Sequence, residues 1–142
     1  MIQRIPFQIV ELENQSYHIV IDGKIEDVDV TLIIDTGASR TIIDKCFAGK
    51  LEKLSMGAEN PMATGLSAEQ IPVELFNISR LTLEGVVFEN IQSLTADLNA
   101  INEVYKNLTG KTIGGLIGCD FLLKKVKKID FQKKYLTVSV KH

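Results

Sequence analysis

An uncharged apolar run that ends on a single carboxylate is the feature that most constrains this chain. Residues 30–34 carry no charge and are rich in β-branched side chains, which indicates a buried β-strand. Asp35 ends the run, so the strand would deliver this carboxylate to the edge of a packed core. Gly37 allows a sharp turn and a close approach by another group, and the hydroxyls of Thr36 and Ser39 can hold the turn by hydrogen bonds. Taken alone, the segment is better explained as an ordinary turn at the end of a strand.

A second segment, far downstream, combines apolar residues, a glycine and an acid. Leu116 and Ile117 precede Gly118, and the acid Asp120 follows with Phe121 and Leu122 behind it, a pattern that predicts a buried strand followed by a short helix. Considered by itself, this segment could be any buried strand interrupted by glycine.

Together the two segments resemble the aspartic peptidases, in particular the single-lobe, retropepsin-like branch of that family. The resemblance covers residues 17–140 and implies an all-β fold, mainly β with one or two short helices, closed as a single-lobe retropepsin-like acid protease barrel. It also implies that residues 1–142 form one such domain. It makes Asp35 the catalytic residue and implies no metal and no cofactor. The loop that supports Asp35 would be Thr36, Gly37, Ala38 and Ser39, and the apolar-apolar-Gly motif behind that loop would be Leu116, Ile117 and Gly118.

Residues 59–72 are small and centred on Gly65, and they are flanked by residues able to form strands, so we expect a hairpin with Gly65 near its tip. By resemblance, this hairpin is the flap that closes the substrate cleft. Its substrate-binding residues would be Met62, Ala63, Thr64, Gly65 and Leu66. The flap assignment depends on position in the chain, and an ordinary exposed hairpin is an equally good interpretation.

The chain holds a single Asp-Thr-Gly sequence, whereas two-lobed pepsin-type enzymes carry two such loops. The chemistry needs two adjacent carboxylates that share a proton, one acting as a base towards water and the other as an acid towards the scissile carbonyl. A second copy of the chain, related by a two-fold axis, would supply the second Asp35. The resemblance therefore implies a homodimeric aspartic endopeptidase that acts on a peptide or protein substrate, in which Thr36 of each chain braces the loop of the other.

The hydroxyl that pepsin-type lobes usually carry after the catalytic glycine is missing here, because that position is Ala38. Without that hydrogen bond the ionised carboxylate is less stabilised, so we expect activity at mildly acidic to near-neutral pH. The alternative function is a catalytically inactive module of the same fold that binds extended peptides or a partner protein.

The remaining patterns predict short strands and one good helix. The helix is expected over residues 97–108, with Asp97 as its N-cap, Gly110 beyond its end and Leu98, Ile101, Tyr105 and Leu108 on its apolar face. A helical turn is expected within residues 45–54. The predicted strands are 5–12, 17–21, 27–34, 41–43, 73–76, 78–83, 86–95, 126–131 and 135–140, with turns at 13–16, 22–24, 84–85 and 132–134.

Composition excludes several other classes of protein. The 142 residues, 45% hydrophobic and 24% charged with a net charge of −2, fit one globular domain and do not indicate nucleic acid. The lysines of residues 124–134 have only Phe121, Phe131 and Tyr135 near them, each better explained as a core residue than as a stacking platform, so we expect these lysines to form a solvated face. The Thr-Gly-Lys-Thr at residues 109–112 lacks the earlier glycine of a phosphate-binding loop.

No apolar run is long enough for a membrane span, and residues 1–6 lack the pattern of a secretory signal. We therefore expect a cytoplasmic protein, an expectation that a leader removed from the chain would alter. Cys46 and Cys119 are expected to be reduced and mostly buried thiols. His18 and His142 have no metal-binding partner at useful spacing.

Overall fold

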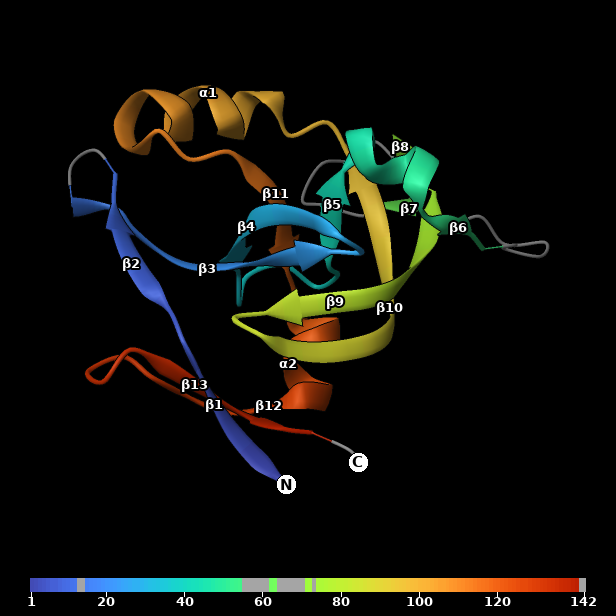
Figure 1. Cartoon of the computed structure of the whole chain (residues 1–142). Helices are drawn as coiled ribbons and strands as arrows, with labels where there is room; N and C mark the ends of the chain where they lie inside the picture. The colour runs from blue at the N-terminus through green and yellow to red at the C-terminus, as the bar shows by residue number, and fades with distance from the viewer. Residues whose placement is uncertain (13–14, 55–61, 64–70, 73, 141–142) are drawn as a thin grey trace.

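The structure, a computed structural model, describes residues 1–12, 15–54, 62–63, 71–72, 74–140 of the chain. Most of these residues belong to β-strands, and the strands close into a barrel (Figure 1). The mainly β fold and the barrel predicted from the sequence are therefore confirmed.

The barrel consists of six strands that follow one another around its wall. In spatial order they are β3 (Tyr17–Ile25), β4 (Val28–Ile34), β11 (Ile113–Ile117), β5 (Ile42–Asp44), β10 (Val86–Ala96) and β9 (Leu75–Leu83). The barrel closes because β9 pairs antiparallel with β3. Two short strands extend this sheet, β2 (Gln8–Glu11) beside β3 and β6 (Glu52–Lys53) beside β9.

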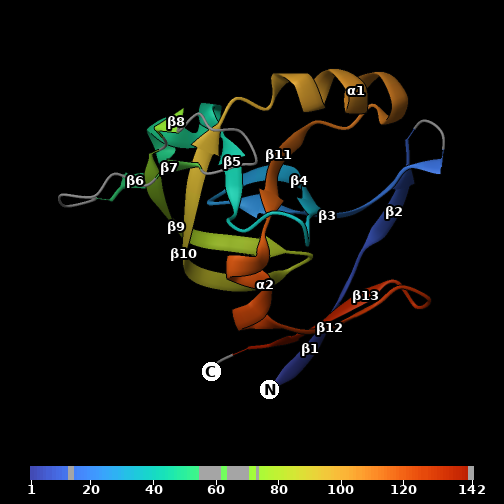
Figure 2. The ribbon, with the colours of Figure 1, turned by 180° about the vertical axis from the view of Figure 1, so that it is seen from behind.

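A second sheet brings the two ends of the chain together. It has the order β1 (Ile2–Pro6), β13 (Tyr135–Ser139), β12 (Val126–Asp130), and it lies below the barrel in Figures 1 and 2. Ile5, Leu136 and Val138 are fully buried and belong to the same hydrophobic core as the barrel residues Ile21 and Ile25. The terminal sheet is thus packed against the barrel by apolar contacts.

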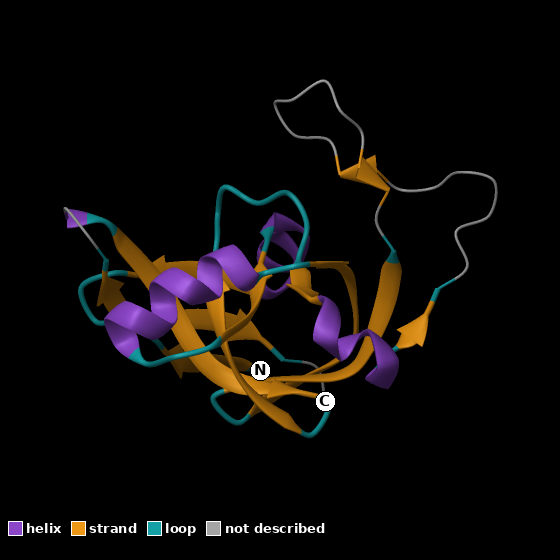
Figure 3. Ribbon diagram, turned by 90° about the horizontal axis from the view of Figure 1, so that it is seen from above, coloured by secondary structure: helices purple, strands orange, loops and turns teal. Residues whose placement is uncertain are grey.

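Helix α1 (Asn99–Thr109) lies across one end of the barrel, as the view from above in Figure 3 shows. It packs through Tyr105, which is buried beside Val20, Ile33 and Ile113, and whose hydroxyl is hydrogen-bonded to His18. Burial raises the pKa of Tyr105 to about 12. The phenol therefore stays neutral at ordinary pH.

The remaining elements are short. They are the 3₁₀-helix η2 (Lys45–Lys50), helix α2 (Cys119–Lys125) and the pair β7 (Met62–Ala63) and β8 (Ile71–Pro72), which form an antiparallel two-stranded sheet. The β7–β8 pair stands to one side of the barrel (Figure 3). In the described part of the chain, every helix is too short or too polar to cross a membrane.

The sequence prediction was wrong at Gly23, which was taken as part of a turn. Strand β3 continues through Gly23 to Ile25, and the turn falls at Glu26 and Asp27 instead. A Cβ atom at position 23 would lie 1.9 Å from the Thr82 carbonyl oxygen of β9. Glycine is therefore required here because the backbones of β3 and β9 approach closely where the barrel closes.

Three predicted strands also have wrong boundaries. The predicted strand 5–12 is divided into β1 and β2, which belong to different sheets, and Phe7 between them donates its N–H to the Lys134 carbonyl. The predicted strands 73–76 and 78–83 form the single strand β9 over its described length, because its residues pair continuously along β10.

Helix α1 and the thiols differ from the predictions in detail. The helix starts two residues after Asp97, which accepts a hydrogen bond from the Asn99 N–H, and Gly110 ends it in the left-handed conformation. Leu108 is 46% exposed, so it does not join the apolar face that packs on the barrel. Both thiols are free as predicted, but Cys46 is exposed rather than buried.

Candidate active site

The loop that carries Asp35 crosses the end of a strand that is distant in sequence. Strands β4 and β5 are consecutive in the chain, yet β11 lies between them in the sheet, parallel to β4 and antiparallel to β5. The chain from Asp35 to Thr41 must therefore pass over the end of β11 to reach β5. This crossing fixes Asp35 against the turn from β11 into α2.

Backbone hydrogen bonds hold Asp35 in place. Its N–H donates to the Ile117 carbonyl of β11 at 2.9 Å, and its own carbonyl accepts the Ala38 N–H at 3.2 Å. One carboxylate oxygen, Oδ1, accepts the Gly37 N–H at 2.9 Å. Asp35 is half-buried, whereas Thr36, Gly37 and Ser39 are exposed, so the loop presents the carboxylate region at the surface.

Gly118 makes the crossing sterically possible. A Cβ atom at this position would lie 2.6 Å from the carbonyl oxygen of Arg40 and 2.9 Å from that of Ala38. The next residue, Cys119, donates its N–H to the Ala38 carbonyl at 2.8 Å and its thiol to the Thr36 carbonyl at 3.2 Å. Among the described residues of one chain, the hydroxyls of Thr36 and Ser39 make none of these bonds.

Thr41 and Asp120 are two supporting residues that sequence reasoning did not identify as a pair. Asp120 Oδ1 accepts hydrogen bonds from the Thr41 N–H at 2.9 Å, the Thr41 hydroxyl at 2.8 Å and the Phe121 N–H at 2.8 Å. The Thr41 hydroxyl in turn accepts the Gly118 N–H at 3.1 Å. Thr41 is fully buried, and a buried hydroxyl needs a partner, but the sequence around it does not reveal this burial.

The other predicted site residues fall into two groups. Ile117 is buried in the main core and Leu116 packs, half-buried, in the cluster around Tyr105. Of the five predicted flap residues, Met62 and Ala63 form β7, while Thr64, Gly65 and Leu66 lie outside the described residues. Pairing of β7 with β8 agrees with the predicted hairpin.

In the described part of one chain, the hydrogen-bond partners of Asp35 include no second carboxylate. No cluster of three or more His, Cys, Asp or Glu side chains able to bind a metal ion occurs among those residues. The arrangement thus offers one partly accessible carboxylate on a loop that backbone hydrogen bonds hold in place.

Comparison with protein families identifies the chain. The family described as "Aspartyl protease" matches residues 21–121, which include the Asp35 loop, β11 and the start of α2. The match spans well over half of the chain, and the chain therefore belongs to the aspartyl protease family. The family resemblance seen in the sequence is confirmed. Comparison with curated proteins gives no match.

Solved structures of similar fold include two retropepsin-like proteins. A retropepsin-like aspartic protease from Rickettsia conorii aligns with a TM-score of 0.56 and 16% identity, over 97% of this chain and 89% of that one. The retroviral protease-like domain of Ddi1 from Leishmania major aligns with a TM-score of 0.51 and 18% identity, over 84% and 86%. At this identity the likeness shows the fold, which is retropepsin-like.

Proposed function

We propose that this chain is an aspartic endopeptidase whose catalytic pair consists of Asp35 and Asp35 of a second copy. The observation that carries the proposal is the Asp35 loop itself, in which the carboxylate accepts the Gly37 N–H and the exposed Thr36 and Gly37 are free to meet a second loop. Membership of the aspartyl protease family and the retropepsin-like fold support the same conclusion.

We assign the second carboxylate to a second chain, since no described residue of the same chain offers Asp35 a hydrogen-bonded carboxylate partner. A two-fold axis passing by the loop brings two identical carboxylates together. Two carboxylates a few ångströms apart do not both ionise readily, so the pair holds one proton between them, and its titration belongs to the pair.

Hydrolysis then follows from the singly protonated pair. The ionised Asp35 takes a proton from a water molecule, whose oxygen attacks the carbonyl carbon of the scissile peptide, while the protonated partner donates its proton to the carbonyl oxygen. Collapse of the tetrahedral intermediate breaks the C–N bond, and a proton passed to the nitrogen lets the amine leave. The exposed Gly37 leaves room beside the carboxylates for an extended substrate backbone.

Digestion of a mixed peptide library between pH 3 and pH 8, read by mass spectrometry, tests this function. We expect cleavage by the wild-type chain at mildly acidic to near-neutral pH, and no cleavage by Asp35→Asn. An Asp29→Asn variant is the matched control, since the side chain of Asp29 is 90% exposed. Absence of cleavage at concentrations where the dimer forms would instead favour a peptide-binding module of the same fold.

A further inference from the structure

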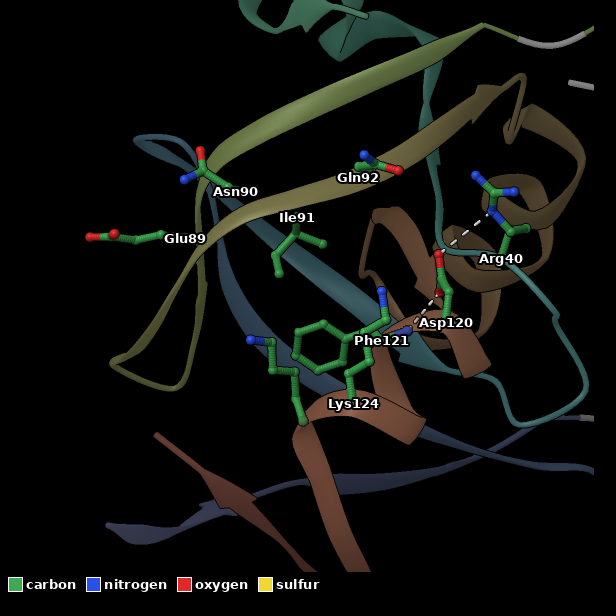
Figure 4. A pocket seen from close by; sticks show the side chains of 9 residues that line it. Arg40, Glu89, Asn90, Ile91, Gln92, Asp120, Phe121 and Lys124 are labelled. Atoms are coloured by element: carbon green, nitrogen blue, oxygen red, sulfur yellow. Dashed lines mark hydrogen bonds and ion pairs between the residues drawn. The ribbon is translucent and has the colours of Figure 1, made fainter. Parts of the chain in front are cut away.

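A cavity of about 450 Å³ lies between strand β10 and helix α2, and Asp35 does not line it. Its size falls in the range of about 300–1,000 Å³ that is usual for small-molecule sites. Figure 4 shows side chains from β10 on one side, side chains from α2 on the other, and Arg40 with Asp120 at one end. The cavity is therefore separate from the Asp35 site but adjoins the loop that carries it.

The floor of the cavity is apolar. Phe121 is 3% exposed and Ile91 is 9% exposed, and the Phe121 ring packs edge-on against Phe88 with 5.0 Å between the ring centroids. Both floor residues belong to the main hydrophobic core, which holds them in position. A ligand with an aliphatic or aromatic body would contact this floor, and because both side chains are already almost buried, it would remove only a small apolar area from water there.

The rim of the cavity is mainly cationic. Arg40, Lys124 and Lys125 line it together with two carboxylates, Glu89 and Asp120, which leaves one net positive charge. Asp120 is already occupied, because its Oδ1 accepts three hydrogen bonds from protein donors and its Oδ2 lies 3.9 Å from Arg40 Nε. The Arg40 side chain remains 44% exposed, so part of its guanidinium is available to a ligand.

These charges discriminate between classes of anion. A planar guanidinium matches the two oxygens of a carboxylate, and the amides of Asn90 and Gln92 on the β10 side of the rim can supply further hydrogen bonds. Glu89 stands on the same rim and would repel a dianion such as phosphate more strongly than a monoanion. The net charge of the cavity therefore suits a single carboxylate.

We propose that the cavity between β10 and α2 binds a monocarboxylate carried on an apolar body, with Arg40 and Lys124 as its anchors. Such a carboxylate can belong to a free small acid or to an acidic side chain of a peptide. Binding at this site does not require peptidase activity, so its test is independent of the proposed function.

The test is a titration of the full chain, labelled with ¹⁵N and carrying Asp35→Asn to prevent cleavage, followed by NMR. N-acetyl-phenylalanine serves as the free acid and N-acetyl-Glu-Phe-amide as the peptide acid. Their uncharged controls are N-acetyl-phenylalaninamide and N-acetyl-Gln-Phe-amide. We expect the side-chain amides of Asn90 and Gln92 to shift with at least one acid, and the Kd of that acid to be about tenfold lower than that of its uncharged control.

Two variants keep the proposal falsifiable even if one of them disturbs the fold. Arg40→Gln and Lys124→Gln are each expected to raise the Kd of the bound acid several-fold. Lys133→Gln, in the exposed turn between β12 and β13, removes the same charge away from the cavity and should leave the Kd unchanged.

The choice of acid identifies the source of the carboxylate: shifts with the free acid alone indicate a small metabolite-like ligand, and shifts with the peptide acid indicate a polypeptide. Any of three results would overturn the proposal. These are no amide shifts with either acid, equal binding of acids and uncharged controls, or tighter binding of inorganic phosphate than of both acids.

Discussion

Thr41 is fully buried at the point where the Asp35 loop enters the barrel, and its hydroxyl makes two hydrogen bonds. One is donated to Asp120 at the start of α2 and the other is accepted from the Gly118 N–H. A single hydroxyl thus joins the loop to the turn between β11 and α2. Burial makes these bonds important, because a polar group that loses its partner inside the protein cannot turn to water.

Thr41→Val keeps the shape of the side chain but removes both hydrogen bonds. The Gly118 N–H would lose its acceptor and Asp120 one of its donors, so we expect a loss of about 1–3 kcal/mol in the free energy of unfolding. Chemical denaturation followed by circular dichroism measures this loss.

Thr137→Val is the matched control for that experiment. Thr137 is also buried, in β13, but its hydroxyl has no hydrogen-bond partner among the described residues. The same substitution there should be neutral or slightly stabilising. Equal losses in the two variants would show that the Thr41 hydroxyl bonds do not matter for stability.

Gly118→Ala tests the crossing of the Asp35 loop over β11. The added methyl group would meet the Arg40 backbone at 2.6 Å, so we expect a destabilisation of about 1–3 kcal/mol and a displaced loop. Gly49→Ala adds the same group where nothing lies within 4 Å and should change the stability by less than about 1 kcal/mol. A fully stable Gly118→Ala variant would contradict the close packing described here.

At the scale of secondary-structure elements, Asp44 connects the end of β5 with two helices. Its Oδ2 accepts the Cys46 N–H at 3.1 Å at the start of η2, and its Oδ1 accepts the Leu98 N–H at 3.0 Å just before α1. Partial burial raises the pKa of Asp44, but the hydrogen bonds from Cys46 and Leu98 outweigh this effect and lower the pKa overall.

A lowered pKa in the folded state means that ionised Asp44 stabilises the fold at pH values above its unfolded pKa of about 3.9. That stabilisation is lost as the pH falls through the lower folded-state pKa. We expect Asp44→Asn to be less stable than wild type by about 0.5 kcal/mol at pH 7, and the difference to shrink as the pH falls below the unfolded pKa of about 3.9. Thermal unfolding measured across this pH range tests the prediction.

Asp29→Asn is a suitable control for the pH experiment. Its side chain is 90% exposed, and its ion pair with Lys24 spans 3.9 Å, so its removal should matter little at any pH. A difference between wild type and Asp44→Asn that is the same at pH 3 and pH 7 would contradict the assigned role of the charge.

The sequence predicted elements well where the local pattern and the tertiary environment agree. The β11–α2 segment and the final hairpin of β12 and β13 fall where expected, because glycine and turn residues bound their apolar runs. The prediction of a turn at Gly23 was wrong because Asp-Gly-Lys is a common turn sequence. The glycine is instead required because the backbone of β9, about sixty residues away in the chain, approaches β3 closely at this position. Local patterns contain no information about such contacts.

The same distinction holds for the candidate site. The loop around Asp35 could be predicted because its strand, acid and glycine are contiguous in the sequence. The contact between Thr41 and Asp120 joins residues separated by 79 positions, and neither residue is unusual in its own segment. The cavity beside Arg40 arises only when β10 and α2 are brought together by the fold.

At the scale of the whole molecule, one chain supplies a closed barrel, a terminal sheet and a single carboxylate loop. If the second carboxylate belongs to a second copy, as proposed, catalysis requires two chains to assemble. A variant chain without the carboxylate should therefore inactivate a wild-type partner.

Mixing wild-type and Asp35→Asn chains in equal amounts, after conditions that allow subunit exchange, tests this central claim most directly. If each active site needs Asp35 from both chains, random pairing leaves about a quarter of the dimers active, compared with the same total concentration of wild type. We expect peptidase activity close to that quarter. Activity close to half would contradict it, because each wild-type chain would then be acting without the carboxylate of its partner.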